Sequence, residues 1–499
     1  MFTPKENGEC PTVKEIIGLL NHTTKEDIAL IEKAYAFAER AHEGQKRFSG
    51  KPYFTHVASV GRNLATINVD AATVAAGLLH DTIEDAVATT ETLEKEFGKD
   101  VMELVQGVTK MSKLKYHGVE RHVESLRKFF IAMSKDIRVL LIKLADRLHN
   151  IQTLEFMPES RQKRVALETL EIHARLADRF GIARWKSILE DAAFPYAYPK
   201  EYKQVLAIVK TKRVADEKYA VKIHRSLQKE LAAEGLQSAR VDYRVKNLYS
   251  FWRKLARKEM DASKIYDILA MRIVVKTVEE CYRALGIIHA HWKPVPGRIK
   301  DYIATPKPNG YRSLHTTIFR GDGGAIEIQI LTEEMYTEAQ YGIAAHLFYK
   351  ESGGSSGTIE KNTAWVNELT KWQKEVARSD EFLEHLQMDF FNNRVFVFTP
   401  KGDVIDLPED SSPIDFAYAI HSDIGDHVAG AWVNNKLVTI DTKLKNGNIV
   451  EIDTKETANP KRKWLDHVKT SIARQHIQAY LKKTSPSEIA AQEFLKRKK

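Results

Sequence analysis

The chain has 499 residues, of which 43% are hydrophobic and 29% are charged, and its formal net charge is +9. This length predicts about three domains, and the modest excess of positive charge favours phosphate-bearing partners without distinguishing nucleotides from RNA. Since no apolar run approaches the roughly 20 residues that cross a bilayer and only Cys10 and Cys281 occur, the composition excludes a membrane span, a disulfide framework and a cysteine-based zinc site, and it predicts a cytoplasmic protein.

Helical periodicity runs from residue 25 to about residue 191. Apolar residues recur at i, i+3, i+4 and i+7 in DIALIEKAYAFAERAH, AATVAAGLLHDTIED, VESLRKFFIAMSKDIRVLLIKLADRLHNIQTL and VALETLEIHARLADRFG. This pattern is typical of amphipathic helices. We therefore expect an all-helical domain over residues 1–195, ended by PYAYPKEY with its two prolines.

Short β-branched runs follow a charged helix that we expect at residues 203–234. ARVDYRV, LAMRIVV, HTTIFR and AIEIQIL predict strands, and hence an α+β domain over residues 196–350. Residues 351–392 have the composition of a linker followed by a helix. Residues 393–455 alternate strands and turns around one short helix, which predicts a compact β-rich domain, and residues 456–499 predict a basic helical segment.

The stretch LLHDTIEDA at residues 78–86 places an imidazole and three carboxylates directly after an apolar run. On a helix through residues 74–85, His80 and Glu84 are four residues apart, as are Asp81 and Asp85, so all four share one sector. An exposed acidic helix end is the usual explanation for an isolated His-Asp pair. A buried cluster of this kind would instead require a cation.

Two further segments favour the buried alternative. KLADRLHNIQTL places Asp146 after a very apolar run, and KPYFTHVASVG places His56 at the start of a helix. The chain thereby offers a mixed set of nitrogen and oxygen ligands, namely His56, His80, Asp81 and Asp146. Such a set suits Mn²⁺, Fe²⁺, Co²⁺ or Zn²⁺, with positions left for water and a substrate oxygen, so hydrolysis is the expected chemistry.

The pattern H…HD…D on a helical scaffold resembles the HD phosphohydrolase superfamily, and HDTIED with ADRLHNIQTL resembles specifically the hydrolase domain of RelA/SpoT homologues. The resemblance implies removal of the 3′-diphosphate from (p)ppGpp, with Mn²⁺ held by the four ligands above. It also implies that Glu84 and Asp85 orient or deprotonate the attacking water. The substrate-binding residues that it implies are Arg47, Asn150 and Thr153.

Bases alternate with aromatic residues in KPVPGRIKDYIATPKPNGYRSLH at residues 293–315. This suits a nucleotide, although a solvated basic loop is equally compatible with the stretch alone. In AIEIQIL the strand period places Glu327 and Gln329 on one face, and Asp267 precedes another strand, so Asp267 and Glu327 could share Mg²⁺. YRVKNLYSFWRKL gathers groups at a helix start that could clamp a triphosphate, namely Arg244, Lys246, Ser250 and Lys254.

RVKNLYS, IYDILAMRIVV, PGRIKDYIATPKPNGYRSLHTT, IEIQI and YGIAAH resemble, in order and spacing, the synthetase domain of RelA/SpoT homologues, which has a nucleotidyltransferase-like mixed sheet. The resemblance implies transfer of the β,γ-diphosphate of ATP to the 3′-hydroxyl of GDP or GTP, with Mg²⁺ on Asp267 and Glu327. Glu327 would also accept the hydroxyl proton. The nucleotide-binding residues expected here are Arg244, Lys246, Ser250 and Lys254 for ATP, Lys300, Lys307, Asn309 and His315 for phosphates or guanosine, Tyr311 for stacking on guanine, and Gln329 beside Glu327.

Residues 394–454 resemble a TGS domain, a β-grasp module that in long RelA/SpoT homologues contacts the acceptor end of deacylated tRNA. The resemblance implies tRNA and the ribosome as partners and an RNA contact by His421, for which a helix-capping role is equally compatible. Because the resemblance stops in the helical region after this module, we expect the zinc-finger-like and ACT domains of long homologues to be absent.

The favoured function is therefore a bifunctional (p)ppGpp synthetase and hydrolase without a membrane partner. One alternative is a (p)ppGpp hydrolase whose synthetase domain is an inactive regulatory sensor. A second alternative is a tRNA-binding adaptor without catalysis. The presence of Asp267 and Glu327 argues against the first alternative, and HDTIED argues against the second.

Overall fold

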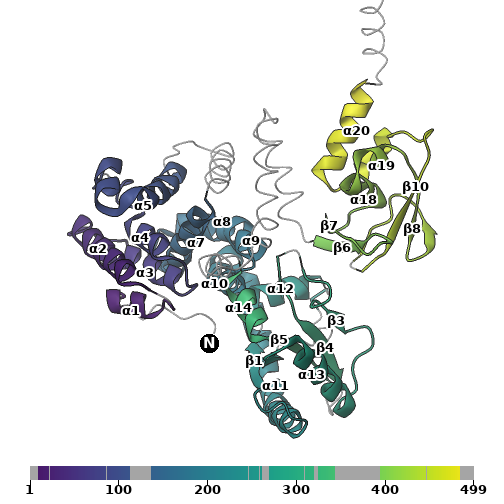
Figure 1. Cartoon of the computed structure of the whole chain (residues 1–499), viewed down its shortest axis with the longest axis horizontal. Helices are drawn as coiled ribbons and strands as arrows, with labels where there is room; N and C mark the ends of the chain where they lie inside the picture. Colours follow the sequence, from purple (N-terminus) through teal and green to yellow (C-terminus); the bar gives the residue numbers. More distant parts are fainter. Residues whose placement is uncertain are drawn as a thin grey trace, which may run out of the picture. The chain divides into compact units, whose positions relative to one another are not determined.

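The structure of the protein is a computed structural model of the chain (Figure 1). It describes residues 9–21, 23–85, 87–112, 136–245, 247–257, 259–260, 269–307, 309–319, 324–342, 394–445 and 447–483. These residues fall into two compact units, one within residues 9–342 and one within residues 394–483. The linker and helix expected at residues 351–392 lie outside the described residues.

The first unit begins with helices, as the periodicity predicted. They are α1 (Val13–Gly18), α2 (Lys25–Ala41), α3 (Phe54–Ala65), α4 (Ala71–Leu79), α5 (Thr90–Ser112), α7 (Ile137–Gln152), the 3₁₀ turn η1 (Leu154–Phe156), α8 (Glu159–Glu168), the π-helical turn η2 (Thr169–His173), α9 (Ala174–Arg179) and α10 (Ala183–Ala197). Pro195 lies inside the last turn of α10, and Pro199 begins the next helix. The domain boundary expected at residue 195 therefore falls near the end of α10.

Helices α3 and α4 approach each other closely through glycine. A Cβ atom added at Gly61 would meet the side chain of Leu78, and one added at Gly77 would meet the side chain of Leu64. Leu64 and Leu78 are fully buried, as is much of α7, which packs against both helices. This packing brings the start of α3, the end of α4 and the middle of α7 to one place.

A mixed five-stranded sheet forms the other half of the first unit. Its strands are β1 (Arg240–Val245), β2 (Leu269–Val275), β3 (Lys300–Asp301), β4 (Leu314–Phe319) and β5 (Ala325–Thr332), in the order β1-β2-β5-β4-β3. The β2–β5 pair is parallel and the other pairs are antiparallel. The predicted α+β class with a mixed sheet is thus confirmed.

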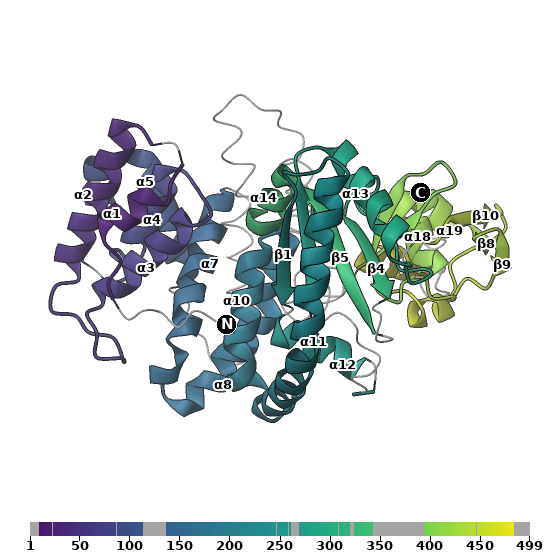
Figure 2. The same cartoon turned by 90° about the horizontal axis from the view of Figure 1, so that it is seen from below.

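Helices cover both faces of this sheet. α11 (Pro199–Ala233) and α13 (Val278–His291) lie across one face (Figure 2), where Met271, Ile273 and Ile328 join their core. α14 (Glu333–Tyr341) packs on the opposite face through Met335 against Val274. α12 (Leu248–Ala256) packs against α10 and α11.

The second unit is small and β-rich. β6 (Arg394–Phe398) and β7 (Val404–Pro408) form a hairpin, while β8 (Val428–Val433), β9 (Lys436–Val438) and β10 (Val450–Thr454) form a sheet in the order β10-β8-β9. The predicted short helix is α18 (Pro413–Ile420), which begins with a capping box of Ser412 and Asp415. α19 (Ser422–Asp426), η4 (Arg462–Asp466) and α20 (Ser471–Lys483) complete the unit.

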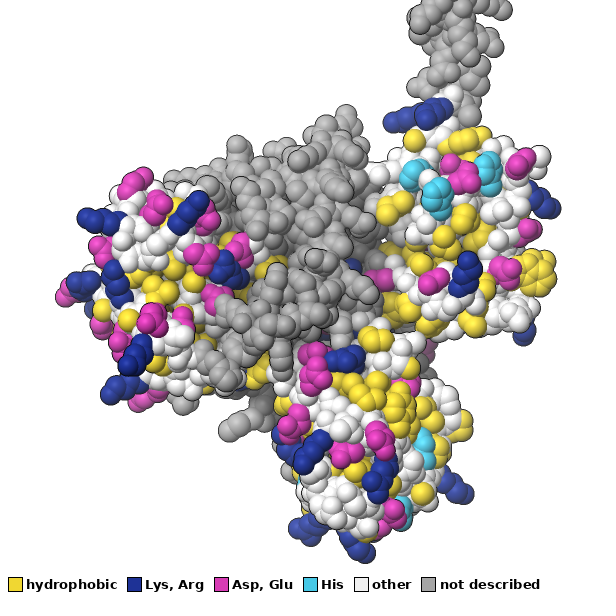
Figure 3. Space-filling view, in the orientation of Figure 1, with side chains coloured by type: hydrophobic (Ala, Val, Ile, Leu, Met, Phe, Trp, Pro, Cys, Tyr) yellow, Lys and Arg dark blue, Asp and Glu magenta, His cyan; other side chains and the backbone are white. Residues whose placement is uncertain are grey.

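Charges of both signs are interspersed on the described surface that faces the viewer in Figure 3. This distribution agrees with a net charge that is modest for the length of the chain. Among the described residues, no helix combines the length and the hydropathy that a membrane crossing requires.

Candidate functional site

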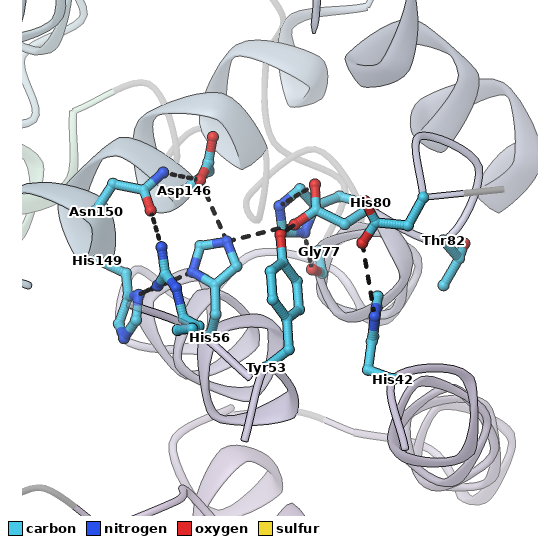
Figure 4. A network of polar contacts seen from close by, with 12 residues as sticks. His42, Tyr53, His56, Gly77, His80, Thr82, Asp146, His149 and Asn150 are labelled. Carbon is cyan, nitrogen blue, oxygen red and sulfur yellow. Dashed lines mark hydrogen bonds and ion pairs between the residues drawn. The ribbon is translucent and has the colours of Figure 1, made fainter. Parts of the chain in front are cut away.

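Three helices bring the predicted metal ligands of the helical half together (Figure 4). His56 lies at the start of α3, His80 directly follows α4, and Asp146 lies on α7. His56 Nε2 lies 3.4 Å from Asp146 Oδ1 and 3.5 Å from Asp81 Oδ2. His80 Nε2 lies 3.1 Å from Asp81 Oδ1. Side chains from three separate segments therefore meet at one point.

The composition of this cluster fits a divalent cation. One ligand atom from each of His56, His80 and Asp146 lies within 4.8 Å of the others, and all three residues are buried. Asp81 is outside that set of three but contacts both histidines. Two imidazole nitrogens and two carboxylates make a donor set that transition-metal ions and Mn²⁺ accept.

Electrostatics in the cluster favour a positive charge among ionised carboxylates. Burial acts to lower the pKa of His80, but Asp81 and Asp146 outweigh this effect and raise that pKa to about 9. Burial likewise acts to raise the pKa of Asp81 and of Asp146, but His80, His56 and, for Asp146, Lys143 hold both pKa values well below the usual range. The charges of the cluster therefore favour a site with a bound cation over an empty site.

The helix that we expected through residues 74–85 ends earlier, at Leu79. His80 is its C-cap, and residues 81–85 form turns. The hydroxyl of Thr82 donates to Leu79 O at 2.7 Å, which competes with continuation of the helix. The continuous helix that we expected through the four polar residues is therefore wrong, although the Asp85 N–H still donates to Asp81 O at 2.9 Å and Asp81 joins the cluster.

The turn separates the two remaining carboxylates. Both Asp85 and Glu84 are exposed, and Asp85 Oδ2 lies 3.8 Å from Nδ1 of the buried His42. Partial burial, followed by the charge of Asp81, raises the pKa of Asp85. A carboxylate with a raised pKa is a better proton acceptor for an attacking water.

A chain of hydrogen bonds joins the cluster to the predicted substrate residues. Arg47 Nη2 donates to Asn150 Oδ1 at 2.6 Å, and Asn150 Nδ2 donates to Asp146 Oδ1 at 2.5 Å. Thr153 is the C-cap of α7, and its hydroxyl donates to His149 O at 3.1 Å. Arg47, Asn150 and Thr153 therefore lie next to the cluster.

Two cavities open beside these residues. One of about 260 Å³ is lined by Arg47, Asp146, Asn150 and Thr153 together with the cations Lys143 and Arg147. The other, of about 110 Å³, also has Arg47 and Thr153 in its wall. An anionic ligand in this space would contact several cationic side chains and would lie next to the candidate metal ligands.

A second group of predicted residues gathers on the sheet. Glu327 and Gln329 lie on the face of β5 opposite Ile326, Ile328 and Ile330, as the strand period predicted. Gln329 Nε2 donates to Glu327 Oε1 at 3.0 Å. His315 Nδ1 on β4 lies 3.8 Å from the same oxygen. The carboxylate is thus flanked by two predicted nucleotide-binding residues.

The basic loop before β4 lies close to this carboxylate. Lys307 Nζ lies 4.7 Å from the ring centroid of Tyr302 and 5.0 Å from that of Tyr311. Tyr311 Oη lies 3.0 Å from His315 Nε2, and Asn309 Oδ1 accepts from the Tyr311 backbone N–H at 3.3 Å. Cationic and aromatic groups are therefore placed beside Glu327.

Strand pairing places two more predicted residues in the same region. Lys300 pairs with His315, which pairs with Gln329. On the other side, Ala270 pairs with both Arg244 and Glu327. Lys246 and Asp267 lie outside the described residues.

Helix α12 carries the last two residues of the predicted triphosphate clamp. Lys254 is exposed. The Ser250 hydroxyl donates to Glu190 Oε2 at 2.9 Å, so this side chain contacts α10.

Comparison with known protein families assigns the three parts of the chain. The HD domain matches residues 34–183, the region found in RelA / SpoT proteins matches residues 243–354, and the TGS domain matches residues 395–454. A guanosine-3′,5′-bis(diphosphate) 3′-pyrophosphohydrolase of Aquifex aeolicus is 44% identical over 477 residues, which are 95% of this chain and 68% of that protein. The chain belongs to the RelA/SpoT family.

Other RelA/SpoT relatives carry names for both opposing activities. A GTP pyrophosphokinase of Myxococcus xanthus is 45% identical over 460 residues, which are 91% of this chain and 61% of that protein. The bifunctional (p)ppGpp synthase/hydrolase SpoT of Escherichia coli is 43% identical over 460 residues, which are 92% of this chain and 65% of that protein. The chain thus spans about three fifths to two thirds of the length of these relatives.

Several side chains around the candidate metal cluster were not predicted, namely His42, Tyr53, Lys143 and His149. Lys143 and His149 lie three residues before and after Asp146 on α7, a spacing that could have indicated them. Lys143 Nζ donates to Asp146 Oδ2 at 2.9 Å. His42 and Tyr53 carry no comparable signal, because their contacts depend on how the segments before α3 fold back on the cluster.

His421 of the TGS module lies at a helix junction. It is the C-cap of α18 and the N-cap of α19, where its Nδ1 accepts from the Asp423 backbone N–H at 3.2 Å. The capping role that we considered is therefore present, and the exposed ring leaves the RNA contact a proposal.

Proposed function

We propose that this chain is a bifunctional alarmone enzyme that both makes and hydrolyses (p)ppGpp. The observation that carries the proposal is the buried cluster of His56, His80, Asp81 and Asp146 beside a cation-lined cavity. Membership of the RelA/SpoT family supports the same reading.

Hydrolysis would take place at this cluster with Mn²⁺ as the cofactor. A divalent ion held there would act as a Lewis acid, which lowers the pKa of a bound water and offsets the negative charge of the phosphates. Asp85 and Glu84 would orient the attacking water and take its proton, while Arg47, Asn150 and Thr153 hold the nucleotide. Water adds to the phosphorus attached to the ribose 3′-oxygen and the bond between them breaks, which gives GDP or GTP and pyrophosphate.

Synthesis would take place around Glu327 on β5, with Mg²⁺ held by Glu327 and Asp267. Glu327 accepts the proton of the 3′-hydroxyl of GDP or GTP, the oxygen attacks the β-phosphorus of ATP, and AMP leaves. Phosphates and guanosine would contact Lys300, Lys307, Asn309, His315 and Gln329, with Tyr311 stacked on guanine. ATP would be held by Arg244, Lys246, Ser250 and Lys254. The carboxylate and loop geometry around Glu327 supports this placement.

The remaining features of the proposal concern organisation and partners. We assign the helical domain to residues 1–195, the α+β domain to 196–350, the linker and helix to 351–392, the TGS module to 393–455 and the basic helical segment to 456–499. The two free cysteines suit the reducing cytoplasm. The TGS module would contact deacylated tRNA, with His421 at the contact, and through it the ribosome.

The two activities oppose each other, and running both would waste ATP. We therefore expect a nucleotide at one site to disfavour the competent state of the other site. Hydrogen-exchange data that show both sites closed and active together would contradict this antagonism.

A pair of variants tests the assignment of both sites. Asp81→Ala should lower hydrolysis of ppGpp with Mn²⁺ by on the order of 10²-fold or more, because it removes a metal ligand, and should leave synthesis unchanged. Glu327→Gln should lower synthesis from ATP and GDP with Mg²⁺ by about 10²- to 10⁴-fold and leave hydrolysis unchanged.

Each variant is the control for the other, since both are assayed for both reactions. Loss of both activities in both variants would mean that the sites are wrongly assigned. Hydrolysis without any synthesis by the unaltered protein would favour the alternative of an inactive, regulatory synthetase domain.

A further inference from the structure

His149 lies at the centre of a hydrogen-bond network that joins the candidate metal ligands to the predicted substrate-binding residues (Figure 4). It lies on α7, one turn after Asp146, and its exposed fraction is only 2%. Its Nδ1 lies 2.8 Å from Arg47 Nη1 and 2.8 Å from His56 Nδ1. Two groups from distant segments therefore converge on a single nitrogen atom.

The protonation of this network follows from the chemistry of arginine. A guanidinium group can only donate hydrogen bonds, so His149 Nδ1 must be the acceptor and carries no proton. The bond between the two imidazoles must then be donated by His56 from its Nδ1–H, so Arg47 and His56 share the single lone pair of His149 Nδ1. In neutral His56 the other nitrogen, Nε2, consequently carries the lone pair, and this is the atom that lies 3.4 Å from Asp146 Oδ1.

His56 and His80 would present Nε2 to a metal ion by different means. His80 Nδ1 lies 2.8 Å from Gly77 O, a main-chain acceptor that no side-chain substitution removes. His56 depends on the side chain of His149. Metal-binding histidines in general donate their second ring N–H to such an acceptor, which fixes the tautomer and the ring orientation.

We propose that His149 is a positioning residue that directs His56 Nε2 toward the metal and at the same time orients Arg47 toward the substrate. The inference rests on the proposed hydrolase site, since it requires a cation at His56. Its consequence is that one acceptor atom supports two functions, metal affinity and nucleotide binding. Removing that atom impairs both.

The test compares three substitutions of His149 in the full chain. In His149→Asn the amide oxygen can occupy the place of Nδ1 and accept both bonds. In His149→Gln the amide lies one bond farther out, near the place of Nε2, and His149→Leu has no acceptor. Binding of Mn²⁺ alone is measured by isothermal titration calorimetry, without nucleotide.

We expect the Leu and Gln variants to bind Mn²⁺ about 10- to 100-fold more weakly than the unaltered protein, and the Asn variant to bind close to normally. At saturating Mn²⁺, the Leu and Gln variants should raise KM for ppGpp more than they lower kcat, because Arg47 loses its acceptor. The matched control is His173→Leu, which removes another buried histidine whose Nδ1 faces Glu168 O. It should leave Mn²⁺ affinity unchanged.

The outcomes separate the inference from the proposed function. If the unaltered protein binds Mn²⁺ no better than His56→Ala, the metal site itself is refuted. If His56→Ala loses Mn²⁺ while the Gln and Leu variants bind it normally, only the role of His149 is overturned. If the Leu variant does not fold, the comparison of Asn with Gln decides, and equal Mn²⁺ affinities for these two would refute the inference.

Discussion

Tyr53 illustrates how a single side chain outside the predicted set can support the cluster. Its hydroxyl donates to Asp81 Oδ2 at 2.8 Å, and its ring lies 5.7 Å from that of His56 between centroids. Burial, together with the charge of Asp81, raises the pKa of Tyr53, so the hydroxyl keeps its proton and remains a donor. We infer that Tyr53 holds the Asp81 carboxylate in the orientation that contacts both histidines.

Tyr53→Phe tests this role. The change removes one hydrogen bond to Asp81 and should weaken Mn²⁺ binding by about 10-fold, with little change in folded structure. Mn²⁺ titration calorimetry and circular dichroism measure the two effects. Tyr35→Phe is the matched control, because the Tyr35 hydroxyl donates to Pro11 O at 3.0 Å, outside the cluster. Equal losses in the two variants would rule out a specific role for Tyr53.

Sequence patterns could predict the residues of the cluster but not the bonds between them. The HD pair and the spacing of Asp146 and Asn150 on one helix are local features, and the structure brings them together as expected. His149 contacts Arg47 and His56, which precede it by 102 and 93 residues. No local period encodes contacts at that separation, so these bonds emerge only when α3 and α7 pack.

At the scale of elements, α12 is held at its N-terminus by acidic side chains of α10. Glu190 Oε2 accepts from Asn247 Nδ2 at 2.6 Å and from Ser250 Oγ at 2.9 Å. Asp191 Oδ1 accepts from the Tyr249 backbone N–H at 3.2 Å. Negative charge at a helix N-terminus is favourable, but burial, with a further contribution from Glu190, raises the pKa of Asp191 to about 7.

This pKa predicts a stability that depends on pH. A carboxyl whose pKa is about 7 in the folded protein, and 3.8 as its ordinary value in the unfolded chain, contributes stability that is complete below about pH 4 and is lost as the pH rises through 7. Asp191→Asn, which cannot ionise, should be about as stable as the unaltered protein at pH 5. The difference in stability between the two should grow as the pH rises. At pH 8 it should be more stable by about 2–3 kcal/mol, which is a rise of roughly 4 °C in Tm.

Differential scanning fluorimetry from pH 5 to pH 8 measures this difference. Glu94→Gln, which changes an exposed carboxylate on α5, is the control and should follow the unaltered protein at every pH. A difference between Asp191→Asn and the unaltered protein that stays constant with pH would contradict the assignment.

The end of α4 shows that helical periodicity does not predict where a helix ends. Helical period continues through HDTIED, so the sequence predicts a helix to residue 85, yet the helix ends at Leu79. The hydroxyl bond from Thr82 to Leu79 O and the backbone bond from Asp85 N–H to Asp81 O form a turn that the period does not distinguish from helix. Strands β1, β2, β4 and β5, in contrast, were predicted because their alternation and their β-branched composition agree, whereas the two-residue β3 lies in the stretch that was expected to be a loop.

At the scale of the whole molecule, the two candidate sites share one compact unit. α10 packs against α7 and α8 of the helical half and against α11, α12 and α14 of the sheet half. Gly342, at a φ of +55°, follows α14, and a Cβ atom there would overlap the backbone of Phe180 and Gly181. Asn309 of the basic loop donates from Nδ2 to Asp178 O at 3.2 Å. These contacts would give the proposed antagonism between the sites a direct structural route, and none of them is encoded locally in the sequence.

The second unit extends beyond the segment that resembles a TGS domain. Asp415 of α18 is fully buried, and its Oδ1 accepts from the backbone N–H groups of Lys469 and Thr470, each at 2.8 Å. Trp464, Val468 and Ile477 share a hydrophobic cluster with Ile414 of the same helix. The polypeptide after β10 therefore supplies both the polar partners and part of the core of α18.

This dependence has a practical consequence for anyone who prepares the module as a fragment. A fragment of residues 394–483 should be monomeric in size-exclusion chromatography and give dispersed amide signals in NMR. A fragment cut at residue 454 would leave Asp415 Oδ1 without the donors at Lys469 and Thr470 and would uncover an apolar face of α18, so it should aggregate. Equal behaviour of the two fragments would show that residues 455–483 are not needed for folding of the module.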